Sequence, residues 1–193
     1  MKKLYAVITL ATIAALFTGC TIPHFVAADY PRYLSNNYGA SKLPTTKAAF
    51  QYSMTPNTEH HKYEFRSATV GYANLWVVEI GKMLEKTLQS KDIQEAFGKL
   101  EKSSARNKTG ADLIVFDLAS YAFVDYGAHI TLRISLTSGG KEILAKTYDA
   151  EGKTQGKKMF WGGVFGMKNA IQQSTKLALD EILRSFIHDI NKK

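Results

Sequence analysis

Cysteine and proline are scarce in this sequence, and most of it lacks long apolar runs. Its 193 residues include a single cysteine, Cys20, which excludes a disulfide framework and any cysteine-rich zinc site. Apolar residues make up 45% and charged residues 22% of the chain. That balance excludes a disordered chain and a protein with many membrane spans, and the length predicts one folded domain rather than two.

Motifs of the common enzyme classes are also missing. The sequence contains no nucleophile elbow, no phosphate-binding or dinucleotide-binding glycine loop and no metalloprotease histidine pair. The one local cluster of metal-ligating residues is Glu59-His60-His61, and adjacent residues of an extended segment point to opposite sides. Asp112 and Asp117 have opposite strand parity, which argues against a catalytic carboxylate pair. We therefore expect no catalytic residues, no metal and no other cofactor.

The start of the chain has the layout of a secretory leader. Lys2 and Lys3 form a short basic region, residues 4–17 carry no charge, and the small residues Thr18 and Gly19 follow. A membrane-spanning helix needs about 20 apolar residues, which is more than this run provides. We therefore predict that residues 1–19 are a cleaved signal peptide.

Residues 16–20, Leu-Phe-Thr-Gly-Cys, resemble the lipobox of bacterial lipoproteins, although Phe17 stands where that motif usually has leucine. The resemblance implies that Cys20 becomes the triacylated first residue of the mature chain. Two or more acyl chains hold a protein firmly on a membrane, since each buried methylene contributes about 0.8 kcal/mol. Thr21 stands where an aspartate would retain such a protein in the inner membrane, which implies an outer-membrane anchor with the domain facing the periplasm. An ordinary leader with an incidental cysteine is the alternative.

Positive charge exceeds negative charge but is spread over the chain. Loss of Lys2 and Lys3 with the leader lowers the formal net charge from +8 to +6. The sequence has no block of five or six basic residues and no basic module interleaved with aromatic residues. We therefore expect a solvated basic surface and no nucleic-acid partner.

Residues 20–46 are predicted to be the lipidated cysteine and a flexible tether. Pro23, Pro31 and Pro44 interrupt this stretch, and no helical or strand periodicity survives between them. A coil of about 25 residues spans roughly 25–30 Å, so the domain would float close to its bilayer. Docking of the tyrosines between residues 30 and 38 on the domain is the alternative.

Residues 47–193 are predicted to form a single α+β domain. Alternating apolar residues indicate strands over 48–54, 63–70 and 130–136, and apolar residues on both faces indicate a central strand over 113–124. A glycine turn at 138–140 predicts a hairpin to a further strand over 142–151. Helical spacing predicts an amphipathic helix over 73–88, a shorter helix around 93–100 and a long C-terminal helix over 164–190. This order predicts a two-layer sandwich, in which a mainly antiparallel sheet packs against the amphipathic helix and the C-terminal helix.

Several landmarks follow one another along the chain. They are the leader with Cys20, Gly71 before an amphipathic helix, Ala111-Asp112-Leu113 opening a strand, a hairpin, and residues 148–152 before a long terminal helix. This order resembles small bacterial envelope lipoproteins, namely the YajG-type lipoproteins and the auxiliary lipoproteins of ABC-type lipid transport systems. The resemblance implies a non-catalytic periplasmic domain that supports transport or assembly machinery.

Residues 159–167, Met-Phe-Trp-Gly-Gly-Val-Phe-Gly-Met, concentrate aromatic side chains around three glycines. Phe160, Trp161, Val164 and Phe165 are the candidate partner-binding residues, as an exposed lip that inserts into a partner groove or into lipid headgroups. The alternative is that the same side chains cap the sheet and belong to the core.

The sequence favours an outer-membrane lipoprotein that acts as a non-catalytic accessory or assembly subunit of an envelope transport or secretion system. Its partners would be the membrane, through the lipid, and other envelope proteins. The alternative function is a periplasmic lipoprotein that holds a lipid or another hydrophobic molecule between the sheet and the long helix. Neither hypothesis fixes an oligomeric state.

Overall fold

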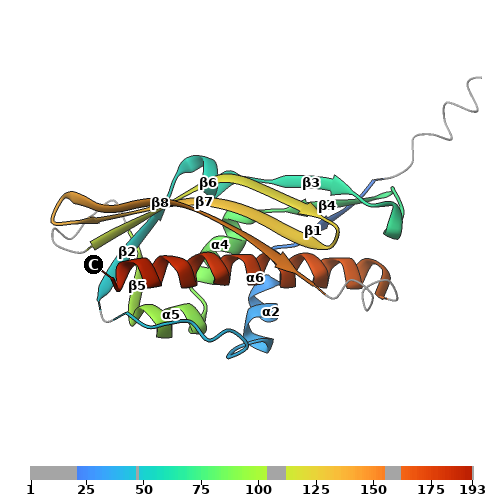
Figure 1. The fold of residues 1–193 in the computed structure, drawn as a ribbon. Coiled ribbons are helices and arrows are strands. Elements are labelled where there is room, and N and C mark those ends of the chain that lie inside the picture. Colours follow the sequence, from blue (N-terminus) through green and yellow to red (C-terminus); the bar gives the residue numbers. More distant parts are fainter. Residues whose placement is uncertain (1–20, 47, 104–111, 155–161, 193) are drawn as a thin grey trace, which may run out of the picture.

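The computed structural model describes residues 21–46, 48–103, 112–154 and 162–192 (Figure 1). Its elements are β1 (Ile22–Phe25), α2 (Tyr30–Asn36), β2 (Ala49–Met54), α3 (Pro56–His60), β3 (Tyr63–Arg66), η1 (Ala68–Val70), β4 (Asn74–Val78), α4 (Ile80–Leu88), α5 (Lys91–Phe97), β5 (Lys99–Lys102), β6 (Asp112–Val124), β7 (Gly127–Ser138), β8 (Lys141–Lys153) and α6 (Gly163–Ile190). The predicted α+β class is confirmed, because a sheet packs against a long C-terminal helix. Within the described ranges, no helix combines the length and the apolar character needed to cross a membrane.

Five strands form the main sheet, in the order β5-β2-β6-β7-β8. The two long ladders, β6–β7 and β7–β8, are antiparallel as predicted, whereas β2 runs parallel to both β5 and β6. Alternate residues from Ile130 to Leu136 are buried on β7, which confirms the predicted inward face of this strand. Gly139 and Gly140 both take positive φ in the turn between β7 and β8, as the tightest hairpins require.

A β-bulge changes which side of β6 faces the core. The pairing of β6 with β7 shifts between Leu118 and Ser120. Alternate residues from Ile114 to Leu118 are buried before the shift, and Tyr121 and Phe123 are buried after it. One extra residue in β6 therefore reverses which face of the strand is turned toward the core.

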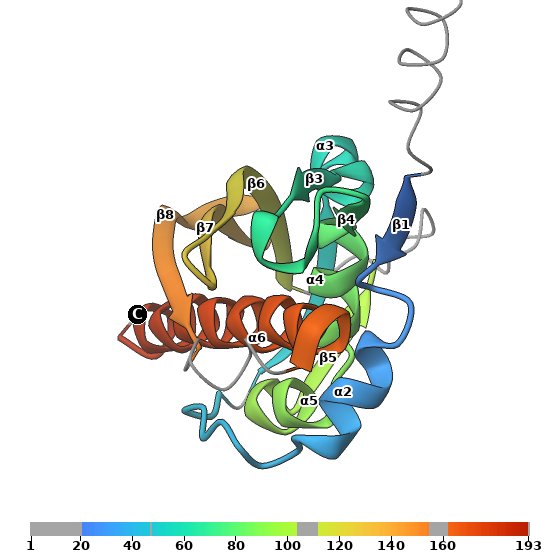
Figure 2. The ribbon, with the colours of Figure 1, turned by 90° about the vertical axis from the view of Figure 1, so that its right-hand side faces the viewer.

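Helix α6 lies between the main sheet and the small helices α2 and α5 (Figure 1, Figure 2). On the sheet side, the Tyr121 hydroxyl lies 2.9 Å from Oγ1 of Thr175. A Cβ atom on Gly152 would overlap the carbonyl oxygen of Ser174, so β8 crosses the helix in direct backbone contact. The helix is therefore buried on two sides.

Residues 73–88 form a strand and a helix, where apolar spacing predicts one helix. β4 is the central strand of a second sheet with the order β1-β4-β3, and α4 begins only at Ile80. Trp76, Val77 and Val78 are all buried, as in a strand that is covered on both faces. The four-residue interval from Trp76 to Ile80 continues the spacing of α4 and hides the boundary between the two elements.

The segment before the main sheet is folded onto the domain, so the predicted flexible tether is wrong for residues 22–46. β1 pairs in parallel with β4, and Val26 and Tyr30 are fully buried. Pro23 lies in an edge strand and Pro31 lies in the first turn of α2, and the missing N–H is tolerated at both places. Pro23 and Pro31 thus stand inside elements rather than in a linker.

Candidate functional site

The predicted lip at residues 159–167 divides at the start of α6. Phe160 and Trp161 lie outside the described residues, as does Cys20. Val164 is half-buried against the core, whereas Phe165 projects into solvent with 86% of its surface exposed. Consecutive helical residues point about 100° apart, which is why one packs inward and the next faces out. Of the two candidate residues that the structure describes, Phe165 is the exposed one.

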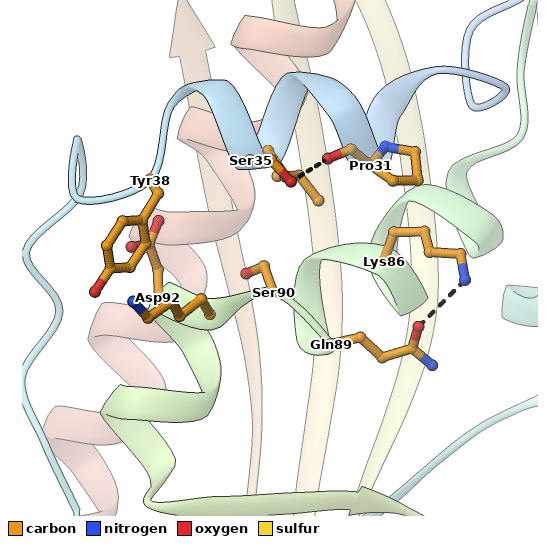
Figure 3. A pocket seen from close by; sticks show the side chains of 9 residues that line it. Pro31, Ser35, Tyr38, Lys86, Gln89, Ser90 and Asp92 are labelled. Atoms are coloured by element: carbon orange, nitrogen blue, oxygen red, sulfur yellow. Dashed lines mark hydrogen bonds between the residues drawn. The ribbon is translucent and has the colours of Figure 1, made fainter.

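A cleft of about 510 Å³ separates α2 from the junction of α4 and α5 (Figure 3). Its lining residues are Pro31, Leu34, Ser35 and Tyr38 on one side and Lys86, Gln89, Ser90, Lys91 and Asp92 on the other. The hydroxyl oxygen of Ser90 is buried and bonds to no other residue in the part of the chain that the structure describes. The cleft therefore offers apolar, cationic and hydrogen-bonding groups together.

Tyr38 stands at one side of this cleft and is 46% exposed. Its hydroxyl donates to Oε1 of Glu95 at 2.7 Å, and the ammonium of Lys91 lies 4.2 Å from the ring centroid. The hydrogen bond with Tyr38, together with the charge of Glu95, raises the pKa of Lys91 above its ordinary value. The rim thus presents an exposed aromatic ring beside a cation, and the carboxylate of Glu95 lies 3.8 Å from the same ammonium.

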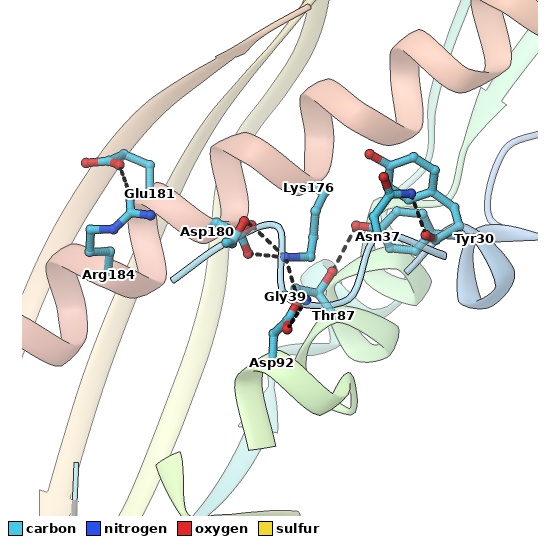
Figure 4. A network of polar contacts seen from close by, with 11 residues as sticks. Tyr30, Asn37, Gly39, Thr87, Asp92, Lys176, Asp180, Glu181 and Arg184 are labelled. Carbon is cyan, nitrogen blue, oxygen red and sulfur yellow. Dashed lines mark hydrogen bonds and ion pairs between the residues drawn. The ribbon is translucent and has the colours of Figure 1, made fainter. Parts of the chain in front are cut away.

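A buried charge network joins α5, α6 and the segment after α2 (Figure 4). Nζ of Lys176 lies 2.6 Å from both carboxylate oxygens of Asp180 and 3.9 Å from Oδ2 of Asp92. The backbone N–H of Gly39 donates to Oδ1 of Asp92 at 2.9 Å, and the Ser41 hydroxyl donates to Asp180. Each carboxylate therefore accepts a hydrogen bond in addition to its interaction with the single ammonium group of Lys176. The network fixes residues 39–41 on the two helices and thereby positions the side of the cleft that carries Tyr38.

A second polar contact holds the N-terminal segment on α6. Nε2 of Gln172 donates to the carbonyl oxygen of Val26 at 3.0 Å and to Oδ1 of Asp29 at 2.7 Å. The ammonium of Lys168 lies 2.9 Å from Oδ2 of Asp29. Burial alone would raise the pKa of Asp29, but the hydrogen bonds from Lys168 and Gln172 hold it below its ordinary value. We call Asp29, Lys168 and Gln172 the N-terminal latch.

An apolar cleft of about 340 Å³ lies where the sheet meets the C-terminal end of α6. Its lining residues are Ala48, Phe50, Asp112, Leu136, Ile143, Leu144 and Ile190. Pockets for small molecules usually measure about 300–1,000 Å³, so this one suits a short chain or ring rather than a whole phospholipid. It lies in the region that the alternative function requires, between the sheet and the long helix.

The Glu59-His60-His61 cluster has a different geometry from the extended segment that the sequence predicts. Helix α3 ends at His60, and both histidines line a cleft of about 440 Å³. The carboxylate of Glu59 accepts a hydrogen bond from Lys102 at 2.6 Å, and that of Glu79 accepts one from Lys82 at 2.7 Å. Over residues 21–46, 48–103, 112–154 and 162–192, no three His, Cys, Asp or Glu side chains are grouped to hold a metal.

Sequence analysis did not predict the cleft beside α2 or the buried network. Both need residues 26–41 to pack on the domain, whereas the sequence predicted a flexible tether there. A signal was nevertheless present, since Gln172, Lys176 and Asp180 follow at four-residue intervals along α6. That interval places the three on one face of the helix. In the structure, Gln172 and Asp180 on this face bond to Val26 and Ser41, which belong to the segment predicted to be a flexible tether.

Comparison with known proteins gives distant likenesses only. No protein-family model matches the sequence, and no curated protein matches it significantly. A Xanthomonas campestris protein of the DUF330 family shares a TM-score of 0.49 and 12% identity with this chain, over 78% of this chain and 89% of its own. An uncharacterized protein gives a TM-score of 0.46 and 16% identity, over 76% of this chain and 96% of its own. A hypothetical protein from Chlamydia trachomatis gives a TM-score of 0.44 and 8% identity, over 76% of this chain and 100% of its own.

Proposed function

We propose that the protein is an outer-membrane lipoprotein, anchored through Cys20, whose periplasmic domain is an accessory or assembly subunit of an envelope transport or secretion system. One observation carries the proposal: the leader pattern ends in Leu-Phe-Thr-Gly-Cys at the sole cysteine of the chain. Acyl chains on that sulfur would hold the protein on its membrane. The order of elements, which resembles YajG-type and transport-auxiliary lipoproteins, supports the accessory role.

The partner surface in this proposal is the cleft between α2 and the α4–α5 junction. Its exposed Tyr38 ring and the ammonium of Lys91 stand together at the rim. Aromatic anchors contribute much of the energy of protein interfaces. The buried network of Lys176 holds the rim in place, and a preorganised surface loses less conformational entropy on binding.

Cys20→Ser tests the anchor. We expect the variant to leave the membrane fraction as soluble or unprocessed protein, because a serine hydroxyl does not take the thioether-linked lipid. Fractionation and intact-mass measurement read out the result. Thr21→Ser keeps the sulfur and should fractionate like the parent protein. The proposal fails if Cys20→Ser stays with the membranes as the parent does.

In-cell crosslinking tests the partner surface. A photo-reactive amino acid at Lys86, on the cleft, should give a discrete adduct with an envelope protein. The same group at Lys141, on the exposed β7–β8 hairpin, serves as the control and should give none. Absence of adducts from Lys86, or equal adducts from both positions, would count against the cleft as the partner surface.

The apolar cleft favours the alternative function, a lipoprotein that binds a hydrophobic ligand. Native mass spectrometry of residues 21–193 without detergent should then detect a bound small molecule. Leu144→Trp fills the cleft and should abolish that mass, whereas Ala145→Trp, on the exposed neighbour, should preserve it. Persistent absence of any bound molecule from the parent protein would remove this alternative.

A further inference from the structure

The fold begins directly after Cys20, which places one end of the domain beside the proposed anchor. The backbone N–H of Ile22 donates to the carbonyl oxygen of Ala73 at 2.9 Å, and Oγ1 of Thr21 accepts from Arg66 at 2.9 Å. Consecutive Cα atoms are about 3.8 Å apart, so Cys20 lies within about 8 Å of the first residue of β1. If Cys20 carries a lipid, the segment between the bilayer and the folded domain is therefore only about two residues long.

Exposed apolar side chains gather at the same end. Phe165 in the first turn of α6 is 86% exposed, Tyr72 before β4 is 68% exposed, and Ile22 is 50% exposed. The guanidinium of Arg66 donates both to the carbonyl oxygen of Tyr72 and to the hydroxyl of Thr21. Figure 1 shows the orange first turns of α6, the segment around η1 and the start of β1 at one end of the molecule, and Figure 2 looks onto that end.

The turn between β6 and β7 belongs to this end as well. The Tyr126 hydroxyl lies 3.2 Å from Oγ1 of Thr69 in η1, and η1 also contacts α6. Val124, at the end of β6, is 51% exposed. Single exposed apolar residues are common on proteins, but their grouping at one end from four separate segments indicates a contact surface.

We propose that this end, the proximal face formed by Ile22, Arg66, Tyr72, Val124 and Phe165, lies in the headgroup region of the bilayer that holds Cys20. The inference rests on the lipid anchor of the proposed function. The short connection between Cys20 and β1 indicates that lipid headgroups cover this face. Two residues span at most about 8 Å, and the headgroup layer is itself about 5–8 Å deep. Aromatic side chains concentrate at this depth, and a guanidinium binds phosphate there.

Single-cysteine labelling tests the proximal face, since lipid would block the one native thiol. Full-length lipidated Phe165→Cys protein is labelled with bimane and placed in vesicles of phosphatidylethanolamine and phosphatidylglycerol that contain brominated phospholipid. The matched control is Leu177→Cys, which is 40% exposed on the same helix and about 18 Å further along it. We expect several-fold stronger quenching at position 165 than at position 177, with emission shifted to shorter wavelength.

Each outcome separates the two proposals. If the parent protein, without an added cysteine, reacts with bimane, then Cys20 is a free thiol and the anchor itself is wrong. If the parent is unreactive and both labels are quenched equally, the anchor stands and the proximal face is refuted. A shifted emission without quenching means that protein rather than lipid covers Phe165, which also refutes it. Tyr72→Cys provides a second site on the same face should Phe165→Cys fail to fold.

Discussion

At the scale of single residues, Lys176 holds an ammonium group where water scarcely reaches. The residue is 6% exposed, and the carboxylates of Asp180 and Asp92 beside it are also buried. Removing charges from water costs several kcal/mol for each ion, and the loss is recovered only while the partners remain together. Loss of the Lys176 ammonium alone should therefore destabilise the fold more than loss of Lys176 together with Asp180.

We predict that Lys176→Met lowers the free energy of unfolding by about 3–5 kcal/mol, because Asp180 stays buried without its cation. The double variant Lys176→Met/Asp180→Leu should recover part of this loss, while Asp92 stays buried beside the former ammonium. Lys99→Met, which breaks the exposed pair with Glu101, should cost less than about 1 kcal/mol. Urea denaturation measures all three, and a double variant no more stable than Lys176→Met would contradict the interpretation.

The latch residue Asp29 makes stability depend on pH. The pKa of its carboxyl lies below the ordinary value of 3.8 in the folded state, so its contribution is complete above that pH and is lost as pH falls through the lower folded value. Asp29→Asn should therefore lower the Tm at neutral pH, and the two Tm curves should converge as pH falls below 3.8. Calorimetry across the acid range checks this, and a constant gap would argue against it.

At the scale of elements, sequence patterns predicted those with one clear period and one buried face. β7 alternates without interruption, and its residues from Ile130 to Leu136 are buried as expected. The patterns failed at the short strand β4 and in the N-terminal segment. β4 is covered on both faces and lacks alternation, so its Trp76 was counted with the helix that follows. β1 and α2 are too short to show a period, and Pro23 and Pro31 in them suggested a linker.

The candidate site was predicted in part for the same physical reason. The exposure of Phe165 was expected as one of two possibilities, because a glycine-rich aromatic segment suits a surface as well as a core. The cleft beside α2 depends on pairs such as Ser41 and Asp180, which are 139 residues apart. Local patterns carry no information about contacts at that separation.

The crossing of β8 over α6 depends on a missing side chain. We predict that Gly152→Ala destabilises the fold by about 1–3 kcal/mol or more, because the new methyl group would overlap the backbone of Ser174 and meet the nitrogen of Ala178 at 2.8 Å. Gly162→Ala, where nothing lies within 4 Å, is the matched control and should leave the Tm nearly unchanged. Equal Tm values for the two variants would exclude a tight crossing.

At the scale of the whole molecule, α6 is the central helix, and other elements pack on two sides of it. The sheet covers one side of it, and α2, α5 and the N-terminal segment cover the other (Figure 2). The segment before β2 contributes Val26 and Tyr30 to the core, together with donors to the buried network. The N-terminal segment is thus part of the domain and not an accessory to it.

We predict that a chain beginning at Ala48 loses cooperative unfolding, whereas a chain beginning at Thr21 retains it. The shorter chain uncovers Lys176, Asp180 and the apolar floor beneath Tyr30, and the loss is comparable to the total stability of a typical domain, about 5–15 kcal/mol. Near-ultraviolet circular dichroism during thermal unfolding compares the two. A sharp transition in the shorter chain would restore the idea of a dispensable tether.

The place of α6 at the end of the element order has a kinetic consequence. Gln172 bonds to the carbonyl oxygen of Val26 from 146 residues away, so the earliest part of the domain to be synthesised waits for the last. Contacts this remote form slowly, and the apolar sides of β7 and α2 stay open until α6 arrives. A polypeptide arranged in this way cannot complete its core before the residues of α6 have been synthesised.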